Sequence, residues 1–314
     1  MSSAQMKVLQ HLDVTDDPDE MFEVLLRDGA IIVENVLTPF QIDNVWNELE
    51  PFSEAADPRM RNIYDFYMGA AIEEERENRR QAEAEAAAKG EVPAAPTRNT
   101  RNVTGLSSKS NTFATEVLVH PLYVSMCDRL FGPKSDGYLL NHSHLISVGP
   151  GAVAQPIHRD EAIWAGVPSL GVGSHFLFAS ILALVDFDEE NGATNVVPGS
   201  HLWEGNATGT VGRTPEPDEV LRAVMPAGSA VLYLGWTFHG AGANLTEDVW
   251  RRALHVSYCQ SWLRTEENNA LATPPAIARH LPVEAQALLG YQVHGGLGML
   301  GLRSPIDQMR DGVI

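Results

Sequence analysis

The residues that could do chemistry begin with His158 and Asp160, which stand two positions apart in the segment Gln155–Asp160. On an extended strand, residues i and i+2 point to the same side, so an imidazole and a carboxylate would face one partner together. A distant histidine, His239, would add a second imidazole. Two histidines and one carboxylate, with the other metal positions open, are typical of non-haem Fe(II) oxygenases. We therefore expect His158, Asp160 and His239 to bind iron.

Two arginines downstream of His239, Arg251 and Arg252, fit the same chemistry. Fe(II) held by three protein ligands leaves room for a bidentate keto acid and O₂. The distal carboxylate of that acid needs a cation, and the planar, permanently charged guanidinium group suits a bidentate contact. Adjacent residues of a strand face opposite ways, so only one of the two arginines can enter the site.

The elements that must position these residues change character near Gly137. Before it, the patterns predict helices at 19–27, 38–51 and 121–131 and a strand at 30–37. After it, they predict strands at 138–148, 176–187, 194–197, 229–234 and 252–263, then a helix at 282–289 and a coil tail at 295–314. Helices followed by many strands, without alternation, argue against a parallel doubly wound sheet. We predict a mainly β fold with flanking α-helices around a double-stranded β-helix, a jelly-roll or cupin-like core.

Residues 70–99 stand apart from this pattern. The run 72–89 consists of Glu, Arg, Gln and Ala with almost no large apolar side chain, and prolines follow it. Such a run can form a helix by propensity, but it has no apolar face to bury. We predict an exposed insertion here, either tolerated as a solvated loop or acting as a lid over the active site.

Composition limits the classes of partner. The 314 residues are 44% hydrophobic and carry a net charge of −19, so we expect one folded domain over 1–314 that binds neither nucleic acid nor an anionic membrane. The two cysteines form no disulfide framework, and the sequence shows neither a signal segment nor a membrane-length apolar run. A reducing, cytoplasmic location fits best.

Five motifs occur in an order that resembles a known family. They are residues 155–160, 190–194, 199–203, 239–242 and 251–252. Together they resemble the phytanoyl-CoA dioxygenase (PhyH) family of Fe(II)/2-oxoglutarate-dependent oxygenases, and within it the enzymes that tailor fungal terpenoids, meroterpenoids and alkaloids. The resemblance covers about residues 20–290, with 70–99 as an extra segment.

The resemblance implies roles for individual residues. The triad His158, Asp160 and His239 would bind Fe(II), and Arg251, favoured over Arg252 by its interval from His239, would pair with the distal carboxylate of 2-oxoglutarate. Four further positions are then candidates: Gln155 and Thr194 for hydrogen bonds to 2-oxoglutarate, Thr104 for the co-substrate and substrate pocket, and Trp164 for the substrate pocket. Each has a plainer alternative, as a turn residue, a surface ion-pair partner or a core side chain.

His142 and His144 form another i, i+2 pair on a predicted strand. No nearby carboxylate completes a metal triad with them. We expect His144, with His142 beside it, to form a wall of the substrate cavity, and plain packing within the sheet is the alternative.

The implied reaction uses Fe(II), 2-oxoglutarate and O₂ to oxidise an unactivated C–H bond of a small, largely apolar, natural-product-like substrate, with release of succinate and CO₂. Hydroxylation, desaturation, endoperoxide formation and rearrangement all stay open. The alternatives are an acyl-CoA hydroxylase of the same family, a non-catalytic cupin-like metal- or ligand-binding protein, and an interaction module acting through 70–89. The N-terminal helices and the C-terminal tail could serve a homodimer.

Overall fold

The computed structural model describes residues 8–58, 99–132, 135–164, 173, 175–205 and 212–314. The predicted insertion or lid at 70–99 therefore lies outside the described residues, apart from Asn99. Within the described ranges, none of the helices combines the length and apolar character that crossing a membrane requires.

Most strands belong to one seven-stranded sheet. In spatial order these are β1 (His11–Asp13), β2 (Ala30–Glu34), β8 (Ala230–Leu234), β5 (Leu177–Ala183), β10 (Arg251–Gln260), β4 (Tyr138–Val148) and β3 (Thr100–Thr104). β1 and β2 run parallel, and the other neighbours are antiparallel. A second sheet holds β7 (Leu221–Arg222), β6 (Thr194–Val196) and β9 (His239–Ala241) in that order.

The two faces of the seven-stranded sheet pack against different partners. Side chains of one face, such as Phe178 and Leu254, share a buried cluster with the helices. Side chains of the other face, such as Ile181 and Ala253, share a cluster with Val196 of the second sheet. We call this second side the inner face. Strand alternation therefore sends every second residue of β5, β8 and β10 into the space between the two sheets.

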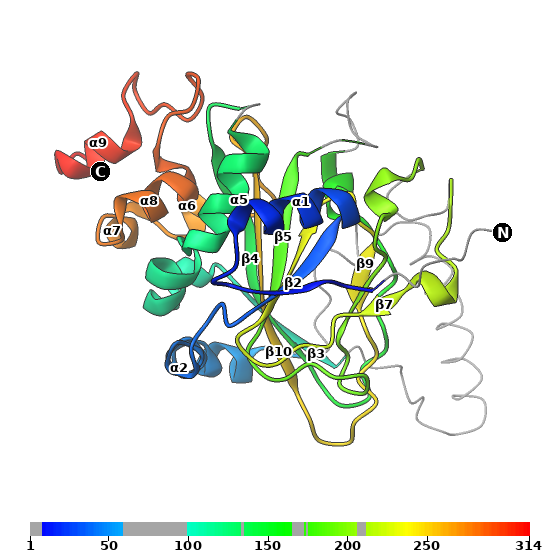
Figure 1. The fold of residues 1–314 in the computed structure, drawn as a ribbon. Helices are drawn as coiled ribbons and strands as arrows, with labels where there is room; N and C mark the ends of the chain where they lie inside the picture. Colours follow the sequence, from blue (N-terminus) through cyan, green and yellow to red (C-terminus); the bar gives the residue numbers. More distant parts are fainter. Residues whose placement is uncertain (1–7, 59–98, 133–134, 165–172, 174, 206–211) are drawn as a thin grey trace, which may run out of the picture.

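Helices flank this pair of sheets, with α2 and α5–α9 on the left of Figure 1 and β7 and β9 on the right. They are α1 (Pro18–Asp28), α2 (Pro39–Ala55), α5 (Pro121–Phe131), α6 (Asn269–Ala272), α7 (Pro275–Ala278), α8 (Val283–Gln286) and α9 (Pro305–Arg310). Local signals explain where the first ones begin and end. Gly29 ends α1 in the left-handed conformation, and Thr38 forms a capping box with Gln41 at the start of α2.

Some elements differ from the prediction. The tail expected as coil contains α9, whose first residue is Pro305. The strand expected at 176–187 is shorter, because β5 ends at Ala183. β3 and β9 were not predicted: both are short, and β3 carries polar residues on both sides, so neither shows a clear alternation of apolar side chains.

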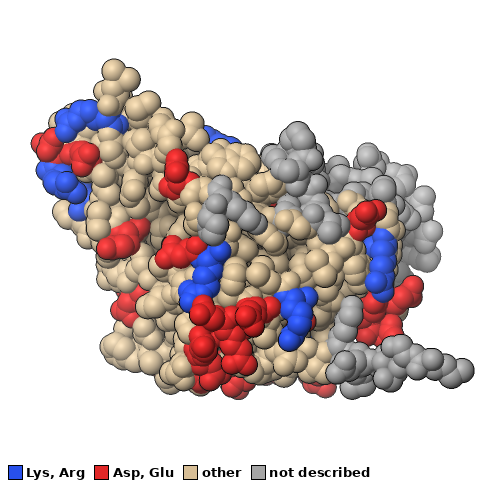
Figure 2. Space-filling model, turned by 45° about the horizontal axis from the view of Figure 1, so that its top comes forward, with Lys and Arg blue, Asp and Glu red and all other residues tan. Residues whose placement is uncertain are grey.

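Charged side chains are distributed unevenly on the surface. On the face drawn in Figure 2, the Lys and Arg side chains lie apart from one another, and Asp and Glu side chains gather beside them. This face therefore presents no continuous basic surface. That observation agrees with the strongly negative net charge of −19.

Candidate metal centre

Two of the predicted iron ligands are joined through their backbones. His158 and His239 form a bridge in which each N–H donates to the carbonyl of the other, at 2.9 and 3.0 Å. The predicted extended strand at 158–160 is limited to this bridge, because Asp160 begins a 3₁₀ helix, Asp160–Trp164. The three side chains still converge: Oδ1 of Asp160 lies 3.4 Å from Nε2 of His158 and 3.4 Å from Nε2 of His239.

Hydrogen bonds set the tautomer of both histidines. Nδ1 of His158 lies 2.8 Å from the carbonyl of Pro156, and Nδ1 of His239 lies 3.1 Å from the carbonyl of Thr237. Because a carbonyl can only accept, each Nδ1 carries the proton and donates it. The Nε2 lone pair of each ring therefore points toward Asp160 and is available to a metal. This donor set fits an Fe(II) ion bound by two imidazoles and a carboxylate.

Asp160 occupies the space between the two sheets. Burial disfavours its charged form, but His239 and His158 outweigh burial and hold the pKa of Asp160 well below its usual range. The carboxylate therefore stays ionised. Its second oxygen, Oδ2, accepts a hydrogen bond from the Tyr233 hydroxyl at 3.0 Å and lies 3.7 Å from Nε2 of His255. Both of these residues project from the inner face and were not predicted as site residues.

Arg159, between the two ligands in sequence, points the opposite way and is 2% exposed. Its guanidinium donates to the carbonyls of Ser200 and Trp203, at 2.9 and 3.2 Å. It also lies over the rings of Phe238 and Trp236, 3.9 and 4.4 Å from their centroids. These contacts connect the segment of His158 and Asp160 to the segment that carries His239.

Glu161, the residue after Asp160, is fully buried. Its Oε1 accepts hydrogen bonds from the backbone N–H groups of Phe176 and Leu177, at 2.9 and 3.0 Å. The start of β5 is thereby joined to the 3₁₀ helix that begins at Asp160. Sequence reasoning missed this role because its signal, a single acidic residue beside the motif, is not specific.

The two arginines separate as the strand geometry predicts. Arg251 is 1% exposed, donates from Nε to the carbonyl of Gly192 at 3.1 Å and lies over the ring of Phe187. Burial lowers the pKa of Arg251 to about 10, so it remains a cation at neutral pH. Arg252 points to the other side and lies 4.0 Å from the ring centroid of Trp46.

The predicted 2-oxoglutarate residues Gln155 and Thr194 lie on either side of β9. Oε1 of Gln155 accepts from the N–H of Ala241 at 3.1 Å, and Thr194 is the register partner of Ala241 in the small sheet. Thr194 is buried, and alternation places its side chain on the same side as that of His239. The structure thus brings Thr194 to the metal side, whereas the amide oxygen of Gln155 serves the backbone.

The predicted substrate residues Thr104, His144 and Trp164 come from β3, β4 and the 3₁₀ helix that begins at Asp160. Thr104 is exposed and stands opposite the buried His144 in the β3–β4 register. Trp164 ends the 3₁₀ helix of Asp160 and donates from its indole N–H to the carbonyl of Arg264 at 2.9 Å. His255 stands opposite His144 on the other side of β4, so it joins this group. Counting two steps of alternation from Arg251 would have found it in the sequence.

Comparison with known proteins places this geometry in context. The family model for phytanoyl-CoA dioxygenase (PhyH) matches residues 25–253. Dioxygenase olcK of Penicillium canescens is 29% identical over 309 residues, which cover 96% of this chain and 88% of that protein. Dioxygenase trt7 of Aspergillus terreus is 31% identical over 294 residues, which cover 92% of this chain and 90% of that protein.

Solved structures share the fold. The crystal structure of the epimerase SnoN in complex with Fe³⁺, alpha ketoglutarate and nogalamycin RO aligns with a TM-score of 0.53 at 21% identity. The alignment covers 78% of this chain and 84% of that one. The predicted fold class, mainly β with flanking helices around a jelly-roll core, is confirmed.

Proposed function

The chain belongs to the phytanoyl-CoA dioxygenase family, and we propose that His158, Asp160 and His239 are the iron ligands of its dioxygenase centre. The protein is an Fe(II)- and 2-oxoglutarate-dependent dioxygenase, an oxidoreductase of the kind that its relatives' names describe. One observation carries the assignment of the ligands: both Nε2 atoms lie 3.4 Å from Oδ1 of Asp160, and both Nδ1 atoms donate to backbone carbonyls.

Each ligand has a defined task. When bound, Fe(II) with 2-oxoglutarate and O₂ supplies the oxidation of a C–H bond. His158 and His239 would each offer Nε2 to the metal, and the hydrogen bonds from Nδ1 to backbone carbonyls orient their rings. Asp160 supplies the negative charge, and Tyr233 orients its free oxygen.

We further propose that Arg251 binds the distal carboxylate of 2-oxoglutarate. Arg251 and His255 are four residues apart on one side of β10, which corresponds to about 13 Å at 3.3 Å per residue. His255 in turn lies 3.7 Å from Oδ2 of Asp160. The spacing of about 13 Å between Arg251 and His255 along the strand leaves room for the five-carbon co-substrate between the guanidinium group and the metal. Thr194, on the metal side of β6, is the better supported of the two further 2-oxoglutarate residues, and Gln155 would act through the backbone of Ala241.

The substrate that this site supports best is a small, largely apolar molecule of the natural-product kind. The inner face carries a cluster of apolar side chains, against which the predicted pocket residue Trp164 packs, and two other predicted pocket residues, Thr104 and His144, are paired on β3 and β4. The alternative substrate, an acyl-CoA, is a polyanion. The net charge of −19 makes it a less suitable substrate for this protein. Hydroxylation, desaturation, endoperoxide formation and rearrangement would all use the same iron ligands and the same 2-oxoglutarate site.

Three further expectations stay predictions. A single domain over 1–314 is supported because residues of both sheets meet at Asp160, through Tyr233 of the large sheet and His239 of the small one. We also propose a homodimer and a cytoplasmic location, as the sequence predicts.

Iron content and succinate formation test the proposal together. Wild-type protein reconstituted with Fe(II) should hold one metal per chain and convert 2-oxoglutarate to succinate. His158→Ala and Asp160→Ala should each lose both properties, whereas His280→Ala, which removes an exposed histidine, should keep both. Normal iron content and normal turnover in the Asp160 variant would contradict the ligand assignment.

A further inference from the structure

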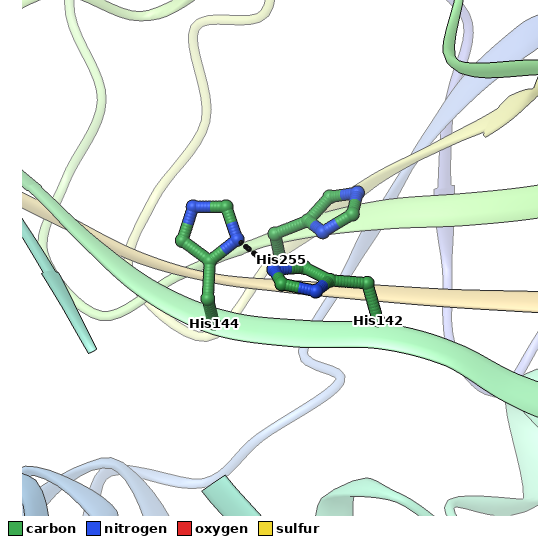
Figure 3. A group of neighbouring side chains, drawn as sticks. All are labelled: His142, His144 and His255. Atoms are coloured by element: carbon green, nitrogen blue, oxygen red, sulfur yellow. Dashed lines mark hydrogen bonds between the residues drawn. The ribbon is translucent and has the colours of Figure 1, made fainter. Parts of the chain in front are cut away.

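Three histidines form a second cluster beside the metal centre. His142 and His144 project from β4, and His255 projects from β10 as the register partner of His144. Figure 3 shows the three rings gathered on one side of the paired strands. Nε2 of His142 lies 2.8 Å from Nδ1 of His144, and the ring centroids of the three are 4.8, 5.5 and 5.9 Å apart.

The cluster borders both the metal centre and an accessible space. Nε2 of His255 lies 3.7 Å from Oδ2 of the iron ligand Asp160. The three histidines keep 6–8% of their surface exposed, whereas their strand neighbours Leu145, Leu254 and Val256 are at 0%. Solvent therefore reaches a small part of each histidine and does not reach these three neighbours, which point to the other face of the sheet.

One ring nitrogen of the cluster, on His255, has no hydrogen-bond partner in the described part of the chain. Nδ1 of His255 is buried and has no hydrogen-bond partner there. Buried polar atoms almost always have a partner, so an atom without one indicates a water, an ion or a ligand. A neutral imidazole offers one donor and one acceptor. Nδ1 of His255 can therefore donate or accept one hydrogen bond, depending on the tautomer of the ring.

The charges in and around the histidine cluster limit the kind of group that can bind there. Burial lowers the pKa of His142 to about 3 and that of His144 well below its usual range, so both rings are neutral near pH 7. Carboxylates stand at both ends of the cluster: Asp160 next to His255, and Glu267 with Oε2 4.0 Å from Nδ1 of His142. An anionic ligand would lie between these two carboxylates, which disfavours it.

A second metal ion is also disfavoured. The contact between His142 and His144 engages one nitrogen of each ring. Any metal bound by the three imidazoles would lie beside the Fe(II) ion, and the carboxylate between them, Asp160, already serves that ion. The cluster suits a neutral hydrogen-bonding group better than a cation.

We propose that His142, His144 and His255 form a hydrogen-bonding site for an uncharged hydroxyl or carbonyl group on the otherwise apolar substrate. This proposal rests on the proposed function, because it places the site next to the iron. An oxygen held by the cluster and a carbon skeleton held by the apolar inner face together orient the substrate. The site thereby selects which C–H bond lies nearest the metal.

Matched bicyclic probes test this chemistry without relying on turnover. The probes are trans-decalin, 2-decalone, decahydronaphthalene-2-carboxylate and 2-aminodecalin, measured by equilibrium dialysis under nitrogen against protein loaded with Fe(II) and 2-oxoglutarate. Wild-type protein should bind 2-decalone at least about ten-fold more tightly than each of the other three, a difference of about 1.4 kcal/mol. Equal binding of ketone and hydrocarbon, or a preference for the carboxylate or the amine, would overturn the proposal.

Variants then assign the preference to the cluster. His144→Leu and His142→Leu should lose the ketone preference while keeping decalin binding and one Fe(II) per chain. His144→Gln, which retains a donor and an acceptor, should restore part of the preference and also controls for misfolding. A second metal equivalent in wild type that the Leu variants lack would show a metal site instead.

The two proposals fail separately. Wild-type protein that holds no Fe(II) contradicts the proposed function. Protein that holds Fe(II) and 2-oxoglutarate but does not discriminate among the probes contradicts only the substrate site.

Discussion

Arg251 and Arg252 are adjacent in sequence and lie on opposite faces of β10. Arg251 is buried on the inner face, where it donates to the carbonyl of Gly192, and Arg252 lies over the ring of Trp46 on the other side. Strand alternation therefore places two chemically identical side chains in different surroundings, so we expect them to have different roles.

Replacing each arginine with alanine should give different results. Arg251→Ala should raise the apparent 2-oxoglutarate requirement at least about ten-fold, because losing a buried charge-assisted contact costs about 2–5 kcal/mol. Arg252→Ala should leave that requirement unchanged and reduce stability by about 0.5–1 kcal/mol through the lost contact with Trp46. Succinate formation against 2-oxoglutarate concentration measures the first effect and urea unfolding the second. A larger effect on 2-oxoglutarate in the Arg252 variant would mean that the wrong arginine is assigned.

Removing the hydroxyl of Tyr233 should weaken iron binding. Tyr233→Phe deletes the hydrogen bond to Oδ2 of Asp160, and loss of a group that orients a metal ligand typically costs about 10–100-fold in affinity. Anaerobic Fe(II) titration measures the dissociation constant. Tyr291→Phe is the matched control, because its hydroxyl donates to the carbonyls of Ala270 and Thr273. An equal loss of affinity in both variants would indicate general destabilisation.

Arg159→Lys should lower both stability and iron occupancy. An ammonium group cannot reproduce the planar contacts with Phe238 and Trp236 while donating to the carbonyls of Ser200 and Trp203. We expect a loss of about 1.5–3 kcal/mol in the free energy of unfolding, as for hydrogen bonds to charged groups. Denaturant unfolding and iron content at limiting Fe(II) provide the measurements. The exposed Arg279→Lys is the control, and unchanged iron occupancy in Arg159→Lys would show that Arg159 does not position the ligands.

A histidine far from the iron should make stability depend on pH. His120 caps α5 by accepting from the N–H of Leu122, and burial, opposed by a hydrogen bond with Val36, lowers the pKa of His120. The unfolded chain therefore takes up this proton first, at about pH 6.5. The contribution of His120 to stability is present above that pH and is lost as the pH falls toward the lower folded pKa.

His120→Asn tests this dependence. Asparagine keeps a capping acceptor but binds no proton. The difference in free energy of unfolding between wild type and variant should be constant above about pH 7.5. It should shift in favour of the variant as the pH falls below about 6.5. His280→Asn, at an exposed position, is the control for the loss of one histidine. Parallel curves for wild type and His120→Asn would refute the assignment.

Local patterns predicted much of the fold and some of the residues that converge at the candidate site. The capping box of Thr38 and Gln41 and the left-handed Gly29 are short-range signals, and they predicted the limits of α1 and α2 to within a few residues. The spacing of His158 and Asp160 is likewise local. Where a local motif of this kind is present, the sequence alone was sufficient to predict the element or to select the candidate residue.

The remaining features depend on long-range pairing. Alternation along β10 places His255 on the same side as Arg251, but no single-segment pattern reveals that β8 lies near β10, so the contact of Tyr233 with Asp160 could not be predicted. The role of Arg159 depends on carbonyls more than 40 positions away. β3 could not be predicted because its five residues, Thr100–Thr104, bear no apolar stripe.

The reciprocal bridge between His158 and His239 consists of backbone hydrogen bonds alone. The two imidazoles are therefore held in place by peptide groups, and little conformational entropy remains to be lost when an ion arrives. A preorganised site of this kind can release and regain its ion while the chain stays folded. The apoprotein should therefore be a stable, refillable species, in contrast to small zinc domains whose folding depends on the metal.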